Sequence, residues 1–288
     1  MNHRAAGVAA ALFYIVLWSS AYVPSKIGVL DSSPLWFLAV RFAVAGVVAL
    51  LAARAMGAAF PKTRTEWAAA AALGVLTNAL YLGFTYEALR HLASGVGAIV
   101  ASTNPLLLAL LAPWLLRETL TPAKIAGMVL GFGGVVAIVM TRGGSGSAEP
   151  RDVLLAFLGV CALVASTIVF KRWCSGLDLR AVTAIQLLAA SAAVLPFAIV
   201  LEGAPHAQWT ARLIGSFWYL VAVMSVGASL LWFWLLERGE ASRVSAYYFL
   251  TPVFGLGIAW LLLREPVGVQ DLFGLAAIAL GIALVQRA

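Results

Sequence analysis

The chain has 288 residues, of which 63% are hydrophobic and 11% charged, and its mean hydropathy is +0.98. Soluble globular domains carry charged side chains at about a quarter of their positions. This composition excludes a soluble protein and indicates an integral membrane protein.

Charged residues divide the chain into ten apolar stretches of about 20 residues, the length that a helix needs to cross a bilayer. In chain order they cover residues 5–25, 32–53, 67–86, 92–116, 125–141, 153–170, 181–201, 213–236, 244–263 and 267–286. Only Arg4 precedes the first stretch and no separate cleavage region follows it, so we expect a retained span rather than a signal peptide. We therefore predict an all-α polytopic membrane protein with ten transmembrane helices.

Lys and Arg residues are distributed unevenly over the loops between these spans. The termini and the loops on their side hold twelve of the 19, the opposite loops hold six, and Arg41 lies inside a span. Short loops rich in Lys and Arg remain cytoplasmic. We expect both termini on the cytoplasmic side of a bacterial inner membrane, and we attribute the net charge of +7 to this bias rather than to nucleic-acid binding.

Residues that commonly carry enzymatic or metal chemistry are few and scattered. Two cysteines, Cys161 and Cys174, provide no disulfide framework, and three histidines lack metal-ligand spacing. No predicted span combines a nucleophile, an acid pair or a metal cluster at membrane depth. We expect neither enzymatic activity nor a metal or cofactor.

The chain contains one pattern twice, 147 residues apart. The matching positions are Pro105 and Pro252, the LLRE sequences at residues 115–118 and 262–265, Gly127 and Gly274, and Gly134 and Gly281. The only Gly/Ser-rich polar stretch, TRGGSGSAEPR, separates the two copies. We predict a five-helix repeat at residues 5–140, a linker at 141–151 and a second five-helix repeat at 152–287.

An odd number of helices in each copy makes the two copies face opposite ways across the membrane. Inverted repeats of this kind are typical of secondary transporters, whose substrates bind near the bilayer midplane. The duplication therefore favours a transporter.

The order of these features resembles the EamA-domain transporters of the drug/metabolite transporter superfamily over nearly the whole chain. The residues that carry the resemblance are Trp18-Ser19, Arg41, Pro105, Glu118 and Gly127/Gly131/Gly134 in the first copy, and Ser166-Thr167, Pro252, Glu265 and Gly274/Gly281 in the second. The seventh span departs from the pattern, because no Arg there matches Arg41. Within the superfamily the sequence is most similar to the YddG-type exporters, and this similarity implies transport of aromatic and other neutral amino acids.

Polar and aromatic side chains recur at helical spacing in several predicted spans. They either hydrogen-bond helices to one another and anchor the membrane interfaces, or line one cavity for a small zwitterion with an apolar side chain. The predicted substrate-binding residues are Trp18, Ser19, Tyr22, Asn78, Tyr81, Ser102, Asn104, Ser166, Thr167, Ser229, Trp232 and Tyr248.

Pro105 and Pro252 each remove a backbone hydrogen bond inside a predicted span. We predict that they mark gating helices, with a static kink as the alternative. The glycines of the fifth and tenth spans are expected to pack helices closely. Glu118 and Glu265 are expected to form local ion pairs with the adjacent arginines, or helix-end contacts that fix the loop.

No acidic residue stands at mid-depth in any predicted span, which favours gradient-driven movement over proton coupling. We expect a facilitator that exports neutral amino acids by alternating access through a central cavity, as a monomer in the lipid bilayer. The alternatives are an exporter of other small metabolites or drugs, and a structural membrane protein that transports nothing.

Overall fold

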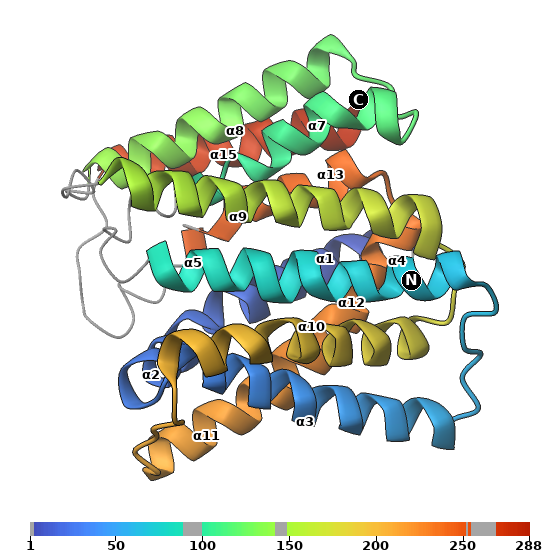
Figure 1. Ribbon diagram of the computed structural model, residues 1–288. Helices are drawn as coiled ribbons and strands as arrows, with labels where there is room; N and C mark the ends of the chain where they lie inside the picture. The colour runs from blue at the N-terminus through green and yellow to red at the C-terminus, as the bar shows by residue number, and fades with distance from the viewer. Residues whose placement is uncertain (1–2, 89–99, 142–148, 252, 255–268) are drawn as a thin grey trace. The chain divides into compact units, whose positions relative to one another are not determined.

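The computed structural model describes residues 3–88, 100–141, 149–251, 253–254 and 269–288, and these residues are almost entirely helical (Figure 1). The elements of the first copy are α1 (His3–Ser20), α2 (Tyr22–Asp31), α3 (Pro34–Ala55), α4 (Arg64–Leu73), η1 (Gly74–Tyr81), α5 (Leu82–Ala88), α7 (Asn104–Leu115) and α8 (Pro122–Thr141). Those of the second copy are α9 (Pro150–Val169), η2 (Phe170–Cys174), α10 (Leu179–Glu202), α11 (Ala211–Tyr219), η3 (Leu220–Ala228), α12 (Ser229–Arg238), α13 (Ala241–Ala246), η4 (Tyr247–Leu250) and α15 (Val269–Arg287).

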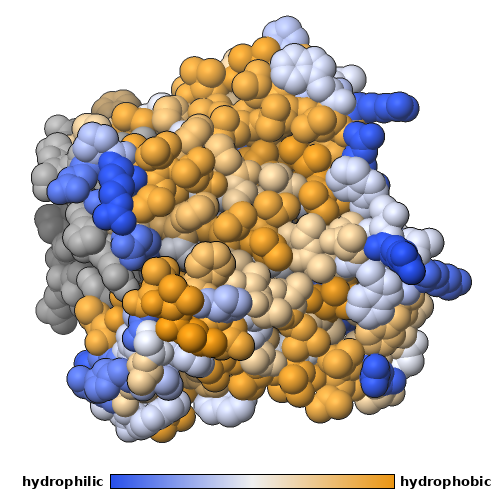
Figure 2. Space-filling model, in the orientation of Figure 1, coloured by the Kyte–Doolittle hydropathy of each residue, from blue (hydrophilic) through white to orange (hydrophobic). Residues whose placement is uncertain are grey.

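Seven helical segments within the described residues are long and apolar enough to cross a membrane. They coincide with the first, second, third, fifth, sixth, seventh and eighth predicted spans. Shorter apolar helices, Asn104–Leu115 and Leu272–Arg287, lie in the fourth and tenth. Half of the ninth span lies outside the described residues, so the number of ten remains a prediction. Apolar side chains cover most of the face seen in Figure 2, as expected of a surface in contact with lipid.

The boundaries of the helices repeat with the interval found in the sequence. A shift of 147 residues moves η1 to residues 221–228, and η3 occupies Leu220–Ala228. The same shift moves the start of α4 to the start of α11, and the start of α8 to the start of α15. The two copies therefore share their irregular segments as well as their apolar spans.

The helices form two compact units, and each unit contains helices of both copies. Unit 1 comprises Met1–Ser19, Glu87–Val164 and Gly239–Ala288, and unit 2 comprises Ser20–Tyr86 and Ala165–Arg238. In unit 2, α3 packs along α10 around a core that includes Leu38, Phe42 and Leu187. In unit 1, α8 packs along α15 around Met128, Val135 and Ile278.

Glycines allow α8 and α15 to touch through their backbones. A Cβ added to Gly127 would lie 2.6 Å from the carbonyl oxygen of Gly281, and one added to Gly134 would lie 2.7 Å from that of Gly274. The order of these contacts makes the two helices antiparallel. The expected close packing of small residues is confirmed, and dispersion forces between the touching backbones stabilise the pair.

In unit 2, carboxylate side chains accept hydrogen bonds from backbone N–H groups at the starts of helices. Both oxygens of Glu202, at the end of α10, accept hydrogen bonds from the backbone N–H of Leu35 at 3.0 and 3.1 Å, in the first turn of α3. Asp178 caps the start of α10 and binds the guanidinium of Arg180, which lowers the pKa of Asp178 to about 2. These contacts satisfy N–H groups that have no partner within their own helix.

We predict that Gly127→Ala and Gly134→Ala lower the unfolding temperature of the purified protein in detergent, because each new methyl group collides with a backbone carbonyl. Overpacking of this kind costs about 1–3 kcal/mol. Gly133→Ala is the matched control in the same helix, because a Cβ there meets nothing within 4 Å. Thermal unfolding of the three variants tests the contact, and an equal loss in Gly133→Ala would contradict it.

Candidate functional site

Two π-helical segments occupy equivalent places in the third and eighth spans. η1 contains Asn78 and Tyr81, and η3 contains Ser225 and leads into α12, which begins at Ser229 and contains Trp232. A π-helix is rare and occurs frequently at functional sites. Its wider turn also alters which residues share a face, so the α-helical spacing assumed from the sequence does not hold through these segments.

Most of the predicted site residues of unit 2 are buried. Asn78, Tyr81, Trp232, Ser166 and Thr167 are all less than 9% exposed, whereas Ser229 is half-buried. The Nδ2 atom of Asn78 is buried without a hydrogen-bond partner. An unsatisfied amide inside a span costs free energy, so Asn78 is more than an inert part of the packing. Tyr22 begins α2, and its side chain lies outside the described residues.

The site residues of unit 1 include a cluster of three aromatic rings. The Tyr14 and Tyr248 hydroxyls are 2.9 Å apart, and the centroid of the Trp18 ring lies 5.9 Å from that of Tyr14 and 5.5 Å from that of Tyr248. The structure thus brings together two predicted residues, Trp18 and Tyr248, and adds Tyr14. Tyr248 meets both of the other rings edge-on, and ring contacts of this kind stabilise the cluster.

Three predicted polar residues of unit 1 are buried, Ser19 in α1 and the other two at a break in the fourth span. Ser19, Ser102 and Asn104 are less than 9% exposed, and Ser19 Oγ and Asn104 Oδ1 have no hydrogen-bond partner. The chain turns at Ser102 and Thr103, and α7 then begins at Asn104.

Pro105 lies in the first turn of α7 rather than within a continuous helix. The span is therefore interrupted here instead of bent, because proline is tolerated at the start of a helix, where its missing N–H has no partner to lose. Pro252 lies outside the described residues. The segment before it, η4, is a 3₁₀ turn that contains Tyr248.

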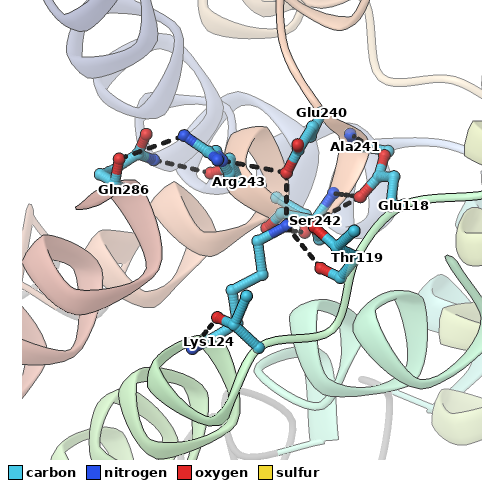
Figure 3. A network of polar contacts seen from close by, with 10 residues as sticks. Glu118, Thr119, Lys124, Glu240, Ala241, Ser242, Arg243 and Gln286 are labelled. Carbon is cyan, nitrogen blue, oxygen red and sulfur yellow. Dashed lines mark hydrogen bonds and ion pairs between the residues drawn. The ribbon is translucent and has the colours of Figure 1, made fainter. Parts of the chain in front are cut away.

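Glu118 caps the start of α13, a helix that belongs to the other copy of the repeat (Figure 3). Its Oε1 accepts a hydrogen bond of 2.6 Å from the backbone N–H of Ala241, and its Oε2 accepts from the backbone N–H and the hydroxyl of Ser242. Of the two contacts expected for Glu118, the structure shows the helix-end contact. The helix is not its own, and the preceding Arg117 adopts φ 59°. Glu265 lies outside the described residues.

A second polar group, which the sequence did not predict, lies beside this cap (Figure 3). The fully buried Lys124 donates to Glu240 and, at 2.9 Å, to the carbonyl of Thr119. Glu240 also accepts from Arg243 at 2.9 Å, and the side chains of Arg243 and Gln286 each donate to the backbone carbonyl of the other residue. We call Glu118, Lys124, Glu240 and Arg243 the α13 network. It ties the start of α13 to α8 and α15.

Electrostatics favour the ionised form of Glu240. Burial alone would raise the pKa of Glu240, but the hydrogen bonds and charges of Lys124 and Arg243 lower that pKa below its ordinary value of 4.5. A cation as deeply buried as Lys124 is stable only when its partner remains ionised. Within the described residues, no group of His, Cys, Asp and Glu is arranged to hold a metal ion.

These observations define a helical membrane protein with a duplicated core and with buried polar and aromatic side chains inside its spans. The chain belongs to the EamA-like transporter family, which it matches over residues 5–140 and again over residues 151–287. It is a multi-pass membrane transporter, and the predicted superfamily is confirmed.

Similar proteins occur in bacteria and elsewhere. The uncharacterized transporter YvbV of Bacillus subtilis is 28% identical to this chain over 95% of this chain and 89% of that protein. The protein PecM of Dickeya dadantii is 24% identical over 96% and 91%. A solved crystal structure shares the fold, with a TM-score of 0.81, 21% identity, and coverage of 98% of this chain and 97% of that chain.

We predict that acidification weakens the α13 network. Glu240 has a lowered pKa in the folded protein, so it contributes stability above pH 4.5 that is lost as the pH falls through the folded value. At pH 7, Glu240→Gln should therefore unfold at a lower temperature than the native chain, and the difference should shrink toward about pH 3.

Thermal unfolding in detergent across this pH range measures the effect. Glu149→Gln, which changes an exposed carboxylate of the same unit, is the control and should follow the native chain at every pH. A difference between Glu240→Gln and the native chain that stays constant from pH 7 to about pH 3 would contradict the assignment.

Proposed function

We propose that this protein is a secondary transporter that exports neutral amino acids with aromatic and other apolar side chains across a bacterial inner membrane. It works by alternating access through a central cavity, and both of its termini face the cytoplasm. The observation that carries the proposal is the pair of π-helices at equivalent places in the two copies, which hold buried polar side chains inside apolar spans.

The side chains of these segments match the chemistry of a neutral amino acid. Such a solute has a carboxylate, an ammonium and an apolar side chain. Amide and hydroxyl groups, such as those of Asn78 and Ser229, can hydrogen-bond the polar ends. Aromatic rings, such as those of Tyr81, Trp232 and Trp18, can pack against the apolar part. Asn104 and Ser19 supply further acceptors that have no partner in the structure.

The α13 network provides a means of gating. Alternating access requires segments that exchange one set of contacts for another. The first N–H groups of α13 donate discrete hydrogen bonds to Glu118, and the helix is irregular before Pro105 and in the 3₁₀ turn before Pro252. We propose that these contacts fix one state of the transporter and separate in the other.

Counterflow tests the proposal directly. The purified protein is reconstituted into liposomes loaded with an unlabelled amino acid, and the entry of a labelled one is measured for a panel of aromatic, aliphatic and charged amino acids. Aromatic and aliphatic neutral amino acids should exchange, and charged ones should not. Exchange of other metabolites without any amino acid would favour the alternative exporter, and no exchange of any solute would favour a structural protein.

We predict that aromatic side chains of the site set its substrate preference. Tyr81→Ala and Trp232→Ala remove packing surface, so exchange of phenylalanine should fall more than exchange of alanine. Asn78→Ala should weaken exchange of both alike, by roughly tenfold, because a lost polar partner costs about 1–3 kcal/mol. Glu118→Gln is the comparison, since Glu118 caps a helix end and should leave preference unchanged. A change of preference in Glu118→Gln, with none in Tyr81→Ala or Trp232→Ala, would place the site elsewhere.

We predict that exchange does not require a proton gradient. The spans hold no acidic side chain at mid-depth to carry the proton. Counterflow in liposomes treated with a protonophore should proceed at the untreated rate. Loss of counterflow when the gradient is collapsed would contradict this prediction.

A further inference from the structure

Arg41 is a buried cation that the site described above does not use. It lies about two turns into α3, inside a membrane-spanning segment, and is 5% exposed. Its Nε donates to Ser225 Oγ of η3 at 3.0 Å, and Tyr86 interacts electrostatically with the guanidinium. Both partners are neutral, so they satisfy hydrogen bonds without neutralising the charge.

Every carboxylate of unit 2 is engaged elsewhere in the structure. Asp31 binds the guanidinium of Arg212 through both oxygens, at 2.6 and 2.7 Å. The others bind backbone or arginine N–H groups at helix ends and loops: Glu66 binds Lys62 and Thr63, Asp178 binds Arg180, Glu202 binds Leu35 and Trp36, and Glu237 binds Gly176. Among the described residues, Arg41 therefore has no anionic partner.

Unsatisfied polar atoms occur on α10, which packs along α3, and on η1, which packs against α10. Asn78 Nδ2 on η1 is a buried donor without a partner, and Thr183 Oγ1 and Gln186 Oε1 on α10 are buried acceptors without one. α10 contacts both α3 and η1. At Gly74, one turn before Asn78, an added Cβ would lie 1.8 Å from the carbonyl oxygen of Gln186, so η1 and α10 touch through their backbones.

The register of α3 against α10 shows where Arg41 lies along α10. Ser191 donates to the carbonyl of Ala39 at 2.9 Å, and Gly46 approaches Leu188. Arg41 lies between the two contacts, so it is level with residues 188–191 of α10, about one turn from Gln186. Gln186 therefore lies about one turn, and Thr183 about two turns, from the level of Arg41 along α10.

We propose that Arg41 binds the carboxylate of the transported solute, with Asn78 as a second donor. A planar guanidinium with five N–H donors binds a carboxylate through two parallel hydrogen bonds, and the bond from Nε to Ser225 uses only one of these donors. The acceptors of Thr183 and Gln186 suit an ammonium group. A buried guanidinium without an anionic partner costs free energy, and binding of the solute's carboxylate removes this cost. The buried charge therefore favours solutes that carry a carboxylate. The inference rests on the proposed function only for the identity of the solute as an amino acid.

Three probes that differ in their charged groups test the proposal on the purified full-length protein. They are L-phenylalanine, L-phenylalaninamide, which keeps the amine but has a neutral amide in place of the carboxylate, and phenylacetate, which keeps the carboxylate but lacks the amine. The rise in unfolding temperature is titrated with each. For the native chain, phenylalaninamide should require at least about tenfold more probe than L-phenylalanine for the same rise, because charge-assisted hydrogen bonds are lost.

Arg41→Gln should reduce this ratio to near one, and Arg41→Lys, which keeps the charge but not the two-pronged geometry, should give an intermediate ratio. If Arg41→Gln does not fold, Arg41→Lys decides. Arg54→Gln is the control, because it removes an exposed arginine from the end of the same helix and should retain the native ratio. A native ratio preserved in the Arg41 variants, or no response of the native chain to either carboxylate probe, would overturn the proposal.

The same probes separate this inference from the proposed function. If phenylacetate stabilises the native chain through Arg41 but no amino acid exchanges in counterflow, the carboxylate site stands and amino-acid export fails. If amino acids exchange and Arg41→Gln still prefers L-phenylalanine over its amide, amino-acid export stands and the assignment of Arg41 fails.

Discussion

The structure depends on one constraint, which is that lipid offers no hydrogen bonds to the backbone. Every N–H and C=O group inside the hydrocarbon region must find a partner within the protein, so helices dominate the described residues. The same rule governs each irregular segment. Where the fourth span breaks before Asn104, Thr103 bonds back to Val100, and where α13 begins, the carboxylate of Glu118 receives its first N–H groups. The irregular segments are thus supported by particular side chains, and the loss of one such side chain affects a whole helix.

Several of these supports connect the two copies of the repeat. Glu118 of the first copy caps a helix of the second, and Glu202 of the second caps α3 of the first. Each contact places a carboxylate at the positive end of a helix dipole, where an anion is stabilised. The two capping carboxylates thus lie at helix ends, where they hold helices together, whereas Arg41 lies within a span. This contrast is what makes its unneutralised charge informative.

The sequence predicted the features that depend on composition and periodicity. The apolar spans and the close packing of glycines follow from residues such as Gly127 and Gly281, whose small size has the same consequence in any membrane helix. It did not predict the π-helices, because Gly74–Tyr81 has the composition of an ordinary span and its wide turn arises from tertiary packing. Nor did it predict the pairing of Lys124 with Glu240, which are 116 residues apart. A charge at the edge of an apolar stretch is read from sequence as a loop residue, and only the fold shows that Lys124 is buried.

The contact between α8 and α15 also bears on how such a chain can arise. Gly127 touches Gly281, the repeat equivalent of Gly134, and Gly134 touches Gly274, the repeat equivalent of Gly127. The glycine patch of one copy therefore packs against the equivalent patch of the other copy. This is the isologous geometry of a homodimer with a twofold axis. A single five-helix polypeptide inserted in both orientations would already have this interface before its gene was duplicated. Once two such halves are joined in one chain they can differ from each other, and Arg41 indeed has no counterpart in the seventh span.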